Sequence, residues 1–135
     1  MKSLGTLLKV AQRKLDELGV EAAKIVVEVA ELRAREDSIR AREQAELVGA
    51  ARDPTFAAML PAYRLRVKWQ IDELKIQMSA KEKALEEIRQ RLSEAYIEKS
   101  KFEQLLDQAE IRAATDCATR EQAQLDEVAI NRAGR

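Results

Sequence analysis

The chain has 135 residues, of which 46% are hydrophobic and 36% charged, but only 4% are aromatic. A compact globular core usually contains more Phe, Tyr and Trp, because their side chains bury the largest apolar areas. The dominant residues here are strong helix formers, and a high charge content with helical periodicity is typical of coiled coils. Lys plus Arg and Asp plus Glu both number 24, so the net charge is zero. A neutral chain is not expected to bind nucleic acid or anionic membranes generally, although it can still carry a local basic patch.

Side chains for catalysis and metal binding are scarce. Histidine is absent, which removes the commonest general base and the commonest ligand for transition metals. The single cysteine, Cys117, can form neither a zinc-binding pair nor an internal disulfide, which fits a reducing cytosol. We interpret Cys117 as a small apolar residue, and adjacent acids such as Glu86 and Glu87 as solvated residues of helix faces. We therefore predict no catalytic residue, no metal site, no cofactor and no small-molecule substrate, and we expect that the protein is not an enzyme.

The start of the chain carries no sign of a signal peptide. The only apolar run there, from Leu4 to Val10, is short and is interrupted by Gly5 and Lys9. No stretch approaches the roughly 18 consecutive apolar residues of a membrane span. The sequence therefore predicts a soluble, cytoplasmic protein.

A heptad pattern predicts a first helix over about residues 3–49. Apolar residues recur at alternating spacings of four and three, which places them on one face of a helix. This stripe turns polar at Glu36 and Glu43, where we expect looser packing or basic partners. The heptad positions are Leu4, Leu8, Ala11, Leu15, Leu18, Ala22, Ile25, Val29, Leu32, Glu36, Ile39, Glu43 and Glu46.

A bend is expected over about residues 50–61, which contain both prolines. Gly49 suits the end of a helix, and Asp53 followed by Pro54 suits the start of the next one. Pro61 is disfavoured inside a helix. The bend is therefore either a short helix at 54–60 or an irregular loop.

A second heptad pattern predicts a second helix over about residues 62–132. Lys81 and Lys99 interrupt its apolar stripe, and such long side chains can carry their charge out to solvent. The pattern decays after Ala113. Its positions are Leu60, Arg64, Val67, Ile71, Leu74, Met78, Lys81, Leu85, Ile88, Leu92, Ala95, Lys99, Phe102, Leu106, Ala109 and Ala113.

Together these patterns predict an all-α single domain of residues 1–135, folded as a long two-helix antiparallel coiled-coil hairpin with a projecting C-terminal helix. Folding back near residue 55 would place Leu4 near Leu106. The remaining residues would then extend beyond the N-terminus as a lone helix. A lone helix is only marginally stable in water, so the apolar residues of this tail predict a partner.

The segment from Tyr63 to Trp69 interleaves three basic residues with two aromatic ones. Trp, Tyr and Arg are common anchors of protein interfaces, so one interpretation is a protein contact. Two alternatives remain open. Trp69 could close the packing near the bend while the basic residues are solvated, or the segment could bind nucleic acid through phosphate contacts and stacking.

The end of the chain, EQAQLDEVAINR from Glu121 to Arg132, resembles the C-terminal signature of the FliJ family. Its distinctive part is Leu-Asp-Glu-x-Ala-x-x-Arg, beginning at Leu125. The opening Met-Lys-Ser-Leu, the length, the central break and the two heptad arms resemble that family too, so the resemblance covers the whole chain. FliJ proteins are small stalk proteins of the bacterial flagellar type III export apparatus and are related to the YscO proteins of virulence secretion.

The resemblance implies three partners and no enzymatic activity. FliJ-like proteins resemble the two-helix rotor shaft of the rotary ATP synthase, and their terminal end inserts into the central hole of the hexameric export ATPase. They also contact the cytoplasmic domain of the membrane-embedded export gate and bind export chaperones. This implies a cytoplasmic protein that is recruited to the inner-membrane export apparatus through protein contacts only.

Two sets of site residues follow from the resemblance. The residues expected to bind the ATPase are Leu4, Leu8, Ile111, Leu125, Asp126, Glu127, Val128 and Arg132. The residues expected to bind the gate lie just after the bend and are Tyr63, Val67, Trp69, Gln70 and Leu74. The alternative functions are a generic coiled-coil scaffold or dimerisation module and, as a third class, a nucleic-acid-binding helical arm. The neutral net charge argues against the third.

Overall fold

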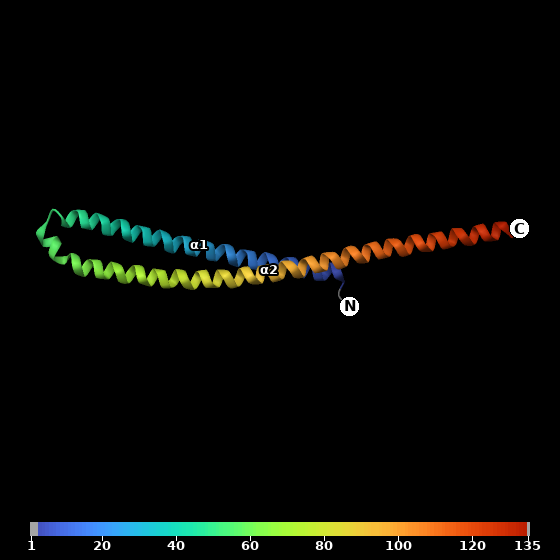
Figure 1. Ribbon diagram of the computed structural model, residues 1–135, viewed down its shortest axis with the longest axis horizontal. Helices are drawn as coiled ribbons and strands as arrows, with labels where there is room; N and C mark the ends of the chain where they lie inside the picture. Colours follow the sequence, from blue (N-terminus) through green and yellow to red (C-terminus); the bar gives the residue numbers. More distant parts are fainter. Residues whose placement is uncertain (1–2, 135) are drawn as a thin grey trace. The chain divides into compact units, whose positions relative to one another are not determined.

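The computed structural model describes residues 3–134, which form two long helices packed against each other and contain no strand. Helix α1 spans Leu4–Ala50 and helix α2 spans Pro54–Ala133 (Figure 1). Ser3 precedes the first turn of α1 and caps it, because its hydroxyl accepts a hydrogen bond from the backbone N–H of Thr6 at 3.2 Å. The all-helical prediction is confirmed for the described residues.

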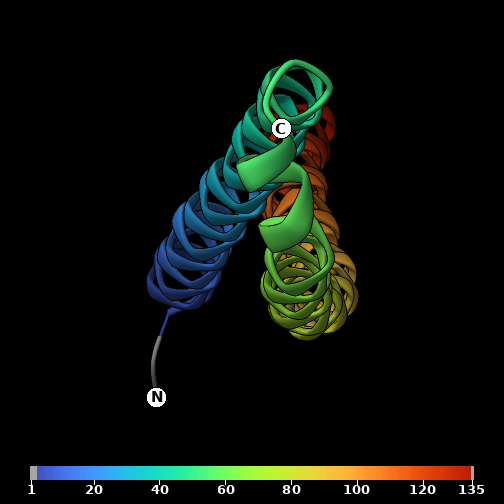
Figure 2. The ribbon, with the colours of Figure 1, turned by 90° about the vertical axis from the view of Figure 1, so that its left-hand side faces the viewer.

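Two compact units make up the described chain. Asp16–Ser93 forms one, and the described residues before Asp16 and after Ser93 form the other. Within Asp16–Ser93 the two helix segments lie side by side in both ribbon views, with the connection at one end (Figure 1, Figure 2). The contacts between these segments pair early residues of α1 with late residues of α2. Glu28 pairs with Lys81, whereas the groove near the connection is lined by Arg40 and Glu43 of α1 together with Pro61 and Arg64 of α2.

The buried residues follow the predicted heptads. Every heptad position of the first helix, from Leu4 to Glu46, is buried or half-buried. In the second helix the same holds from Leu60 to Leu106, except at the exposed Arg64. The heptad stripe is buried because its apolar residues recur on one face of each helix and pack against the stripe of the other helix. The buried apolar residues are Ala11, Leu18, Val29, Leu32, Ala50, Val67, Ile71, Leu74, Met78, Ile88 and Ala95.

The bend is shorter than the sequence predicted. The predicted bend over 50–61 and the predicted start of the second helix at about 62 are wrong, because α2 begins at Pro54 and continues through Pro61. The Asp53 carboxylate accepts a hydrogen bond from Thr55 N at 3.0 Å, and the Asp53 carbonyl accepts one from Ala57 N at 3.1 Å. This cap and the fixed helical φ of Pro54 start the helix early. The helix then tolerates Pro61, whose ring costs it a hydrogen bond but keeps a helical φ.

The end of α1 also differs slightly from the expectation. The helix continues one residue past Gly49, and no glycine of the described chain has a positive φ. The turn closes instead through hydrogen bonds from Ala51 N to Leu47 O at 3.3 Å and from Arg52 N to Gly49 O at 3.1 Å. Residues 51–53 are therefore the whole connection between the helices.

In the unit formed by the ends of the chain, burial stops part-way along α2. Ala11 and Ala95 are buried and Leu106 is half-buried. From Asp107 to Gly134 every described residue is exposed. This final part of α2, called the tail below (residues 107–134), therefore has no covered face.

Candidate interaction surfaces

The five predicted gate residues do not share one accessible surface. Val67 and Leu74 are only 4% and 8% exposed, because they occupy heptad positions that pack against α1. Trp69 is 63% exposed and Gln70 is also exposed, whereas Tyr63 is half-buried. The heptad pattern already carried the signal that separates the two groups, since Val67 and Leu74 belong to the stripe and Trp69 and Gln70 do not.

Exposed apolar residues that were not predicted as site residues surround the connection between the helices. Phe56, Met59 and Leu65 of α2 are each about half exposed or more. A hollow of about 170 Å³ lies here, lined by Glu46, Phe56, Met59, Leu60, Tyr63 and Arg66. The half-buried Tyr63 therefore borders a mostly apolar recess at this end of the helix pair.

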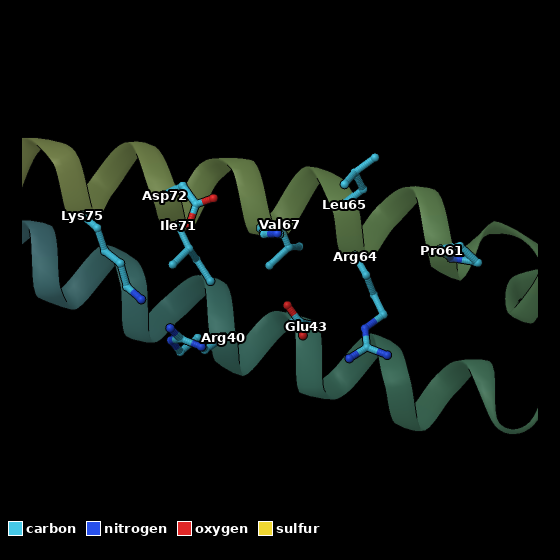
Figure 3. A pocket seen from close by; sticks show the side chains of 10 residues that line it. Arg40, Glu43, Pro61, Arg64, Leu65, Val67, Ile71, Asp72 and Lys75 are labelled. Atoms are coloured by element: carbon cyan, nitrogen blue, oxygen red, sulfur yellow. The ribbon is translucent and has the colours of Figure 1, made fainter.

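A second groove, of about 460 Å³, lies between the two helices next to the connection (Figure 3). Its floor includes the buried Val67 and Ile71, and its walls carry charged side chains from both helices. The charged lining residues are Arg40, Glu43, Arg64, Asp72, Lys68 and Lys75. Four of these six are basic, so this groove has a positive balance of charge. Figure 3 shows Arg64 directed toward α1, although the residue is exposed.

Glu36 and Glu43, two acidic residues at heptad positions of α1, both lie near basic side chains. Glu36 pairs with Arg40 of the same helix at 3.0 Å, and this is an i,i+4 pair of the kind that stabilises helices. Glu43 is half-buried beside Arg40 and Arg64 in the groove. The expectation that acids in the stripe would meet basic residues is confirmed for Glu36, but its partner is intrahelical.

Two ion pairs connect the helices within Asp16–Ser93. Arg33 Nη2 lies 3.3 Å from Glu82 Oε1, with both side chains more than half exposed. The Lys81 ammonium pairs with the Glu28 carboxylate. The hydrogen bond from Lys81 lowers the pKa of Glu28 below its ordinary value of 4.5, assisted by the charges of Lys81 and Lys24 and opposed by desolvation. Lys81 therefore reaches out of the apolar stripe to a specific partner.

The predicted ATPase-binding residues fall into two groups with different exposure. Leu4 and Leu8 are half-buried. Ile111 and Leu125 are 66% and 64% exposed, and Val128 is also exposed. Asp126, Glu127 and Arg132 are exposed too, and the Asp126 carboxylate accepts a hydrogen bond from Gln122 at 3.0 Å. The accessible members of this set are therefore those of the tail.

The tail carries an uncovered apolar stripe and an acidic balance of charge. At 100° per residue, one face of the tail presents Ile111, Ala114, Ala118, Leu125 and Ala129. Its charged residues are the acids Asp107, Glu110, Asp116, Glu121, Asp126 and Glu127 and the bases Arg112, Arg120 and Arg132. Six acids against three bases leave a net charge of −3. Such a surface suits a protein partner with an apolar, positively charged contact region.

The described residues contain no group of three or more His, Cys, Asp or Glu side chains placed to hold a metal ion. Cys117 is exposed, and its Sγ lies 3.7 Å from Glu121 Oε1. No helix within residues 3–134 contains a stretch that is long and apolar enough to cross a membrane. The surfaces at the helix connection and along the tail are thus the candidate functional sites.

A known family matches the chain over its full length. The family model described as "Flagellar FliJ protein" matches residues 1–135. The chain belongs to the FliJ family. The predicted resemblance to FliJ is thereby confirmed, and the protein is a flagellar protein by family.

Individual FliJ proteins are similar to the chain at a modest level of identity. The flagellar FliJ proteins of Caulobacter vibrioides strains NA1000 / CB15N and ATCC 19089 / CIP 103742 / CB 15 are each 27% identical to it over 132 residues. The matched region covers 98% of this chain and 95% of each relative. No solved structure gives a significant match.

Proposed function

We propose that the protein is a non-enzymatic stalk and adaptor of the flagellar type III export apparatus, built as an antiparallel coiled-coil hairpin. Membership of the FliJ family supports a role in flagellar export. The pairing of Glu28 with Lys81, and of the groove residues nearer the connection, supports the antiparallel arrangement. The protein acts in the cytoplasm and is recruited to the inner-membrane export apparatus.

The tail is the part that enters the central hole of the hexameric export ATPase. The observation that carries this proposal is the exposure of every described residue from Asp107 onward, which includes Ile111, Leu125 and Val128. A bare helix is thin enough to pass through a protein ring, and its small alanines allow close approach of the ring's loops. Its apolar side chains gain free energy when a partner covers them, at about 25 cal/mol for each Å² of apolar surface. Leu4 and Leu8 support this end of α2 by packing and contribute less directly to binding.

The connection end of α2 contacts the export gate. Tyr63, Trp69 and Gln70 are the accessible members of the predicted gate set. Val67 and Leu74 hold the helix against α1 and position these residues. Export chaperones are a third class of partner, which is supported by family membership alone.

The ATPase contact is tested with a deletion and with a matched pair of surface variants. Removing residues 114–135 should abolish stimulation of the purified hexameric export ATPase, while circular dichroism still reports a helical protein. Leu125→Ser combined with Val128→Ser should reduce the stimulation strongly. Ile76→Ser combined with Ile97→Ser changes apolar residues of at least equal exposure elsewhere on α2 and should leave it unchanged. Full stimulation by the deletion variant would contradict the proposal.

A dimerisation module is the second candidate, and one observation favours it. Val20, Val26 and Val27 of α1 are exposed, although large apolar residues usually lie against a partner surface when they cluster. Sedimentation equilibrium of the wild type and of Val20→Ser combined with Val27→Ser separates the two candidates. A dimer that dissociates in the double variant would support the module, and a monomeric wild type would exclude it.

A further inference from the structure

The first turns of α2 form a stretch that contains no acidic residue. Between Asp53 and Asp72 the chain has three basic residues, Arg64, Arg66 and Lys68, and no Asp or Glu. The same stretch holds Phe56, Tyr63 and Trp69, which are three of the five aromatic residues of the chain. A run with this composition stands out in a chain whose acids and bases are equal in number.

Within this stretch, the exposed uncharged side chains and the exposed basic side chains lie on different faces of α2. Val67 is buried against α1, and Leu65 and Trp69 lie about 160° to either side of it at 100° per residue. Both are exposed, at 48% and 63%. Leu65 borders the groove between the helices, but Figure 3 shows its side chain directed away from α1. Ala58 and Ala62 are exposed on the same outward side. The outward face, defined here as Ala58, Ala62, Leu65 and Trp69, therefore carries no charge within the stretch, and Asp72 lies on the same side just beyond its end, about 140° from Val67.

Basic residues border the outward face on both edges. Arg66 and Lys68 lie about 100° to either side of Val67, and both are exposed. Their long side chains can extend their charges past the apolar strip. Asp72 and Glu73 follow Ile71 directly and end the acid-free stretch. An apolar strip with cations on both edges and Trp within it is the pattern of a helix that lies in a membrane interface.

We propose that this outward face of α2 binds directly to the surface of an anionic lipid bilayer. Leu65 and Trp69 enter the boundary between headgroups and acyl chains, while Arg66 and Lys68 contact the anionic headgroups. An acidic protein surface would also match the basic residues, but its carboxylates would need hydrogen-bond donors on the outward face. The side chains of the outward face provide only one such donor, the indole N–H of Trp69. This contact goes beyond the proposed function, in which protein partners alone bring the chain to the membrane. It uses Trp69, which the proposed gate contact also uses, so the bilayer and the gate are alternative partners of this side chain.

The only tryptophan of the chain, Trp69, reports directly on the proposed contact. Full-length protein is mixed with vesicles of phosphatidylcholine and phosphatidylglycerol in equal parts, or of phosphatidylcholine alone. The emission of Trp69 should shift to the blue and be quenched by brominated acyl chains with the anionic vesicles only. The shift should weaken strongly at 0.5 M salt, because the Debye length falls to about 4 Å. No shift, or a shift without quenching, would overturn the proposal.

Charge variants test the role of the two edges. Arg66→Glu combined with Lys68→Glu should weaken partitioning to anionic vesicles by at least roughly tenfold, because each basic residue near the surface contributes to the attraction. Lys83→Glu combined with Lys101→Glu makes the same charge change at exposed sites of α2 outside the stretch and should weaken it far less. Equal losses in both variants would overturn the proposal.

Two further measurements distinguish the lipid contact from a protein contact and from a loss of the export function. A blue shift with polyglutamate but not with anionic vesicles would overturn the lipid contact and favour an acidic protein partner. The Arg66 and Lys68 variant should still stimulate the export ATPase, so a loss of lipid binding is distinguishable from a failure of the proposed function. Circular dichroism should show unchanged helicity, because both residues are exposed.

Discussion

At the scale of single residues, Lys81 shows how a charged side chain is accommodated in an apolar stripe. Its position in the heptad would normally hold a hydrophobic residue, yet it is only half-buried and its ammonium reaches Glu28 on the other helix. The pair also contributes to register, because a shift of one helix turn would separate the two charges. Polar residues in heptad positions commonly select register at some cost in stability. Here the ion pair with Glu28 limits the loss of stability that Lys81 causes in the apolar stripe.

The Glu28–Lys81 pair should make the stability of the protein depend on pH. The pKa of Glu28 is lowered by the hydrogen bond from Lys81, so the unfolded state binds its proton more readily than the folded state. This contribution is present above pH 4.5 and is lost as the pH falls through the lowered pKa of the folded state. Thermal unfolding between about pH 7 and pH 3 should therefore show a smaller drop in midpoint for Glu28→Gln than for the wild type.

Glu82→Gln is the matched control for this prediction, because it removes an exposed carboxylate that pairs with Arg33 across the same helices. Its pH dependence should stay close to that of the wild type. The exchange Glu28→Lys with Lys81→Glu should recover stability that Glu28→Lys alone loses. An additive loss in the double variant would show that the two side chains do not interact.

At the scale of elements, the start of α2 is set by its cap, and the helix continues through a proline seven residues later. Asp53 is a preferred residue for the N-cap, and Pro54 is a preferred residue for the first helical position. The hydrogen bond that Thr55 N donates to the Asp53 carboxylate confirms the cap. Pro61 lies in the interior of α2 and is exposed. The helix therefore contains one position where its sequence opposes its structure.

Replacing Pro61 with Ala should stabilise the protein. The change restores a backbone donor and removes the ring, and proline costs up to about 3 kcal/mol relative to Ala in a helix interior. Denaturant unfolding followed by circular dichroism should show a higher midpoint. Pro54→Ala should have little effect, because the missing N–H at the first helical position has no intrahelical partner anyway. A lower midpoint for Pro61→Ala would mean that the folded chain depends on this proline near the connection.

At the scale of the whole molecule, burial is confined to part of the chain. The heptad positions up to Leu106 are buried or half-buried, with Arg64 excepted, and no described residue beyond Leu106 is covered. Packing therefore stabilises the helix pair, whereas the tail has no covered face among the described residues.

Truncation after Leu106 should leave the unfolding temperature nearly unchanged. The removed residues bury nothing in the described structure, so the change should be less than roughly 4 °C, which corresponds to about 1 kcal/mol in a domain of this size. Calorimetry or circular dichroism measures this directly. Truncation after Ile88 also removes the buried Ala95 and the half-buried Leu92 and should lower the midpoint much more. A large drop for the first truncation would show that the tail packs on the rest of the protein.

Much of this protein is determined by its sequence alone. The heptads predicted both helices and their buried faces, because apolar spacing on a helix depends only on local geometry. The Asp53–Pro54 start and the Glu121–Arg132 family signature are local in the same way. Only the tertiary structure decided that Pro61 lies within α2, that Lys81 pairs with Glu28 across the helices, and that Tyr63 borders a recess with Phe56 and Met59. These outcomes depend on which groups of the other helix and of the connection come near in space, and the apolar spacing of one helix does not encode them.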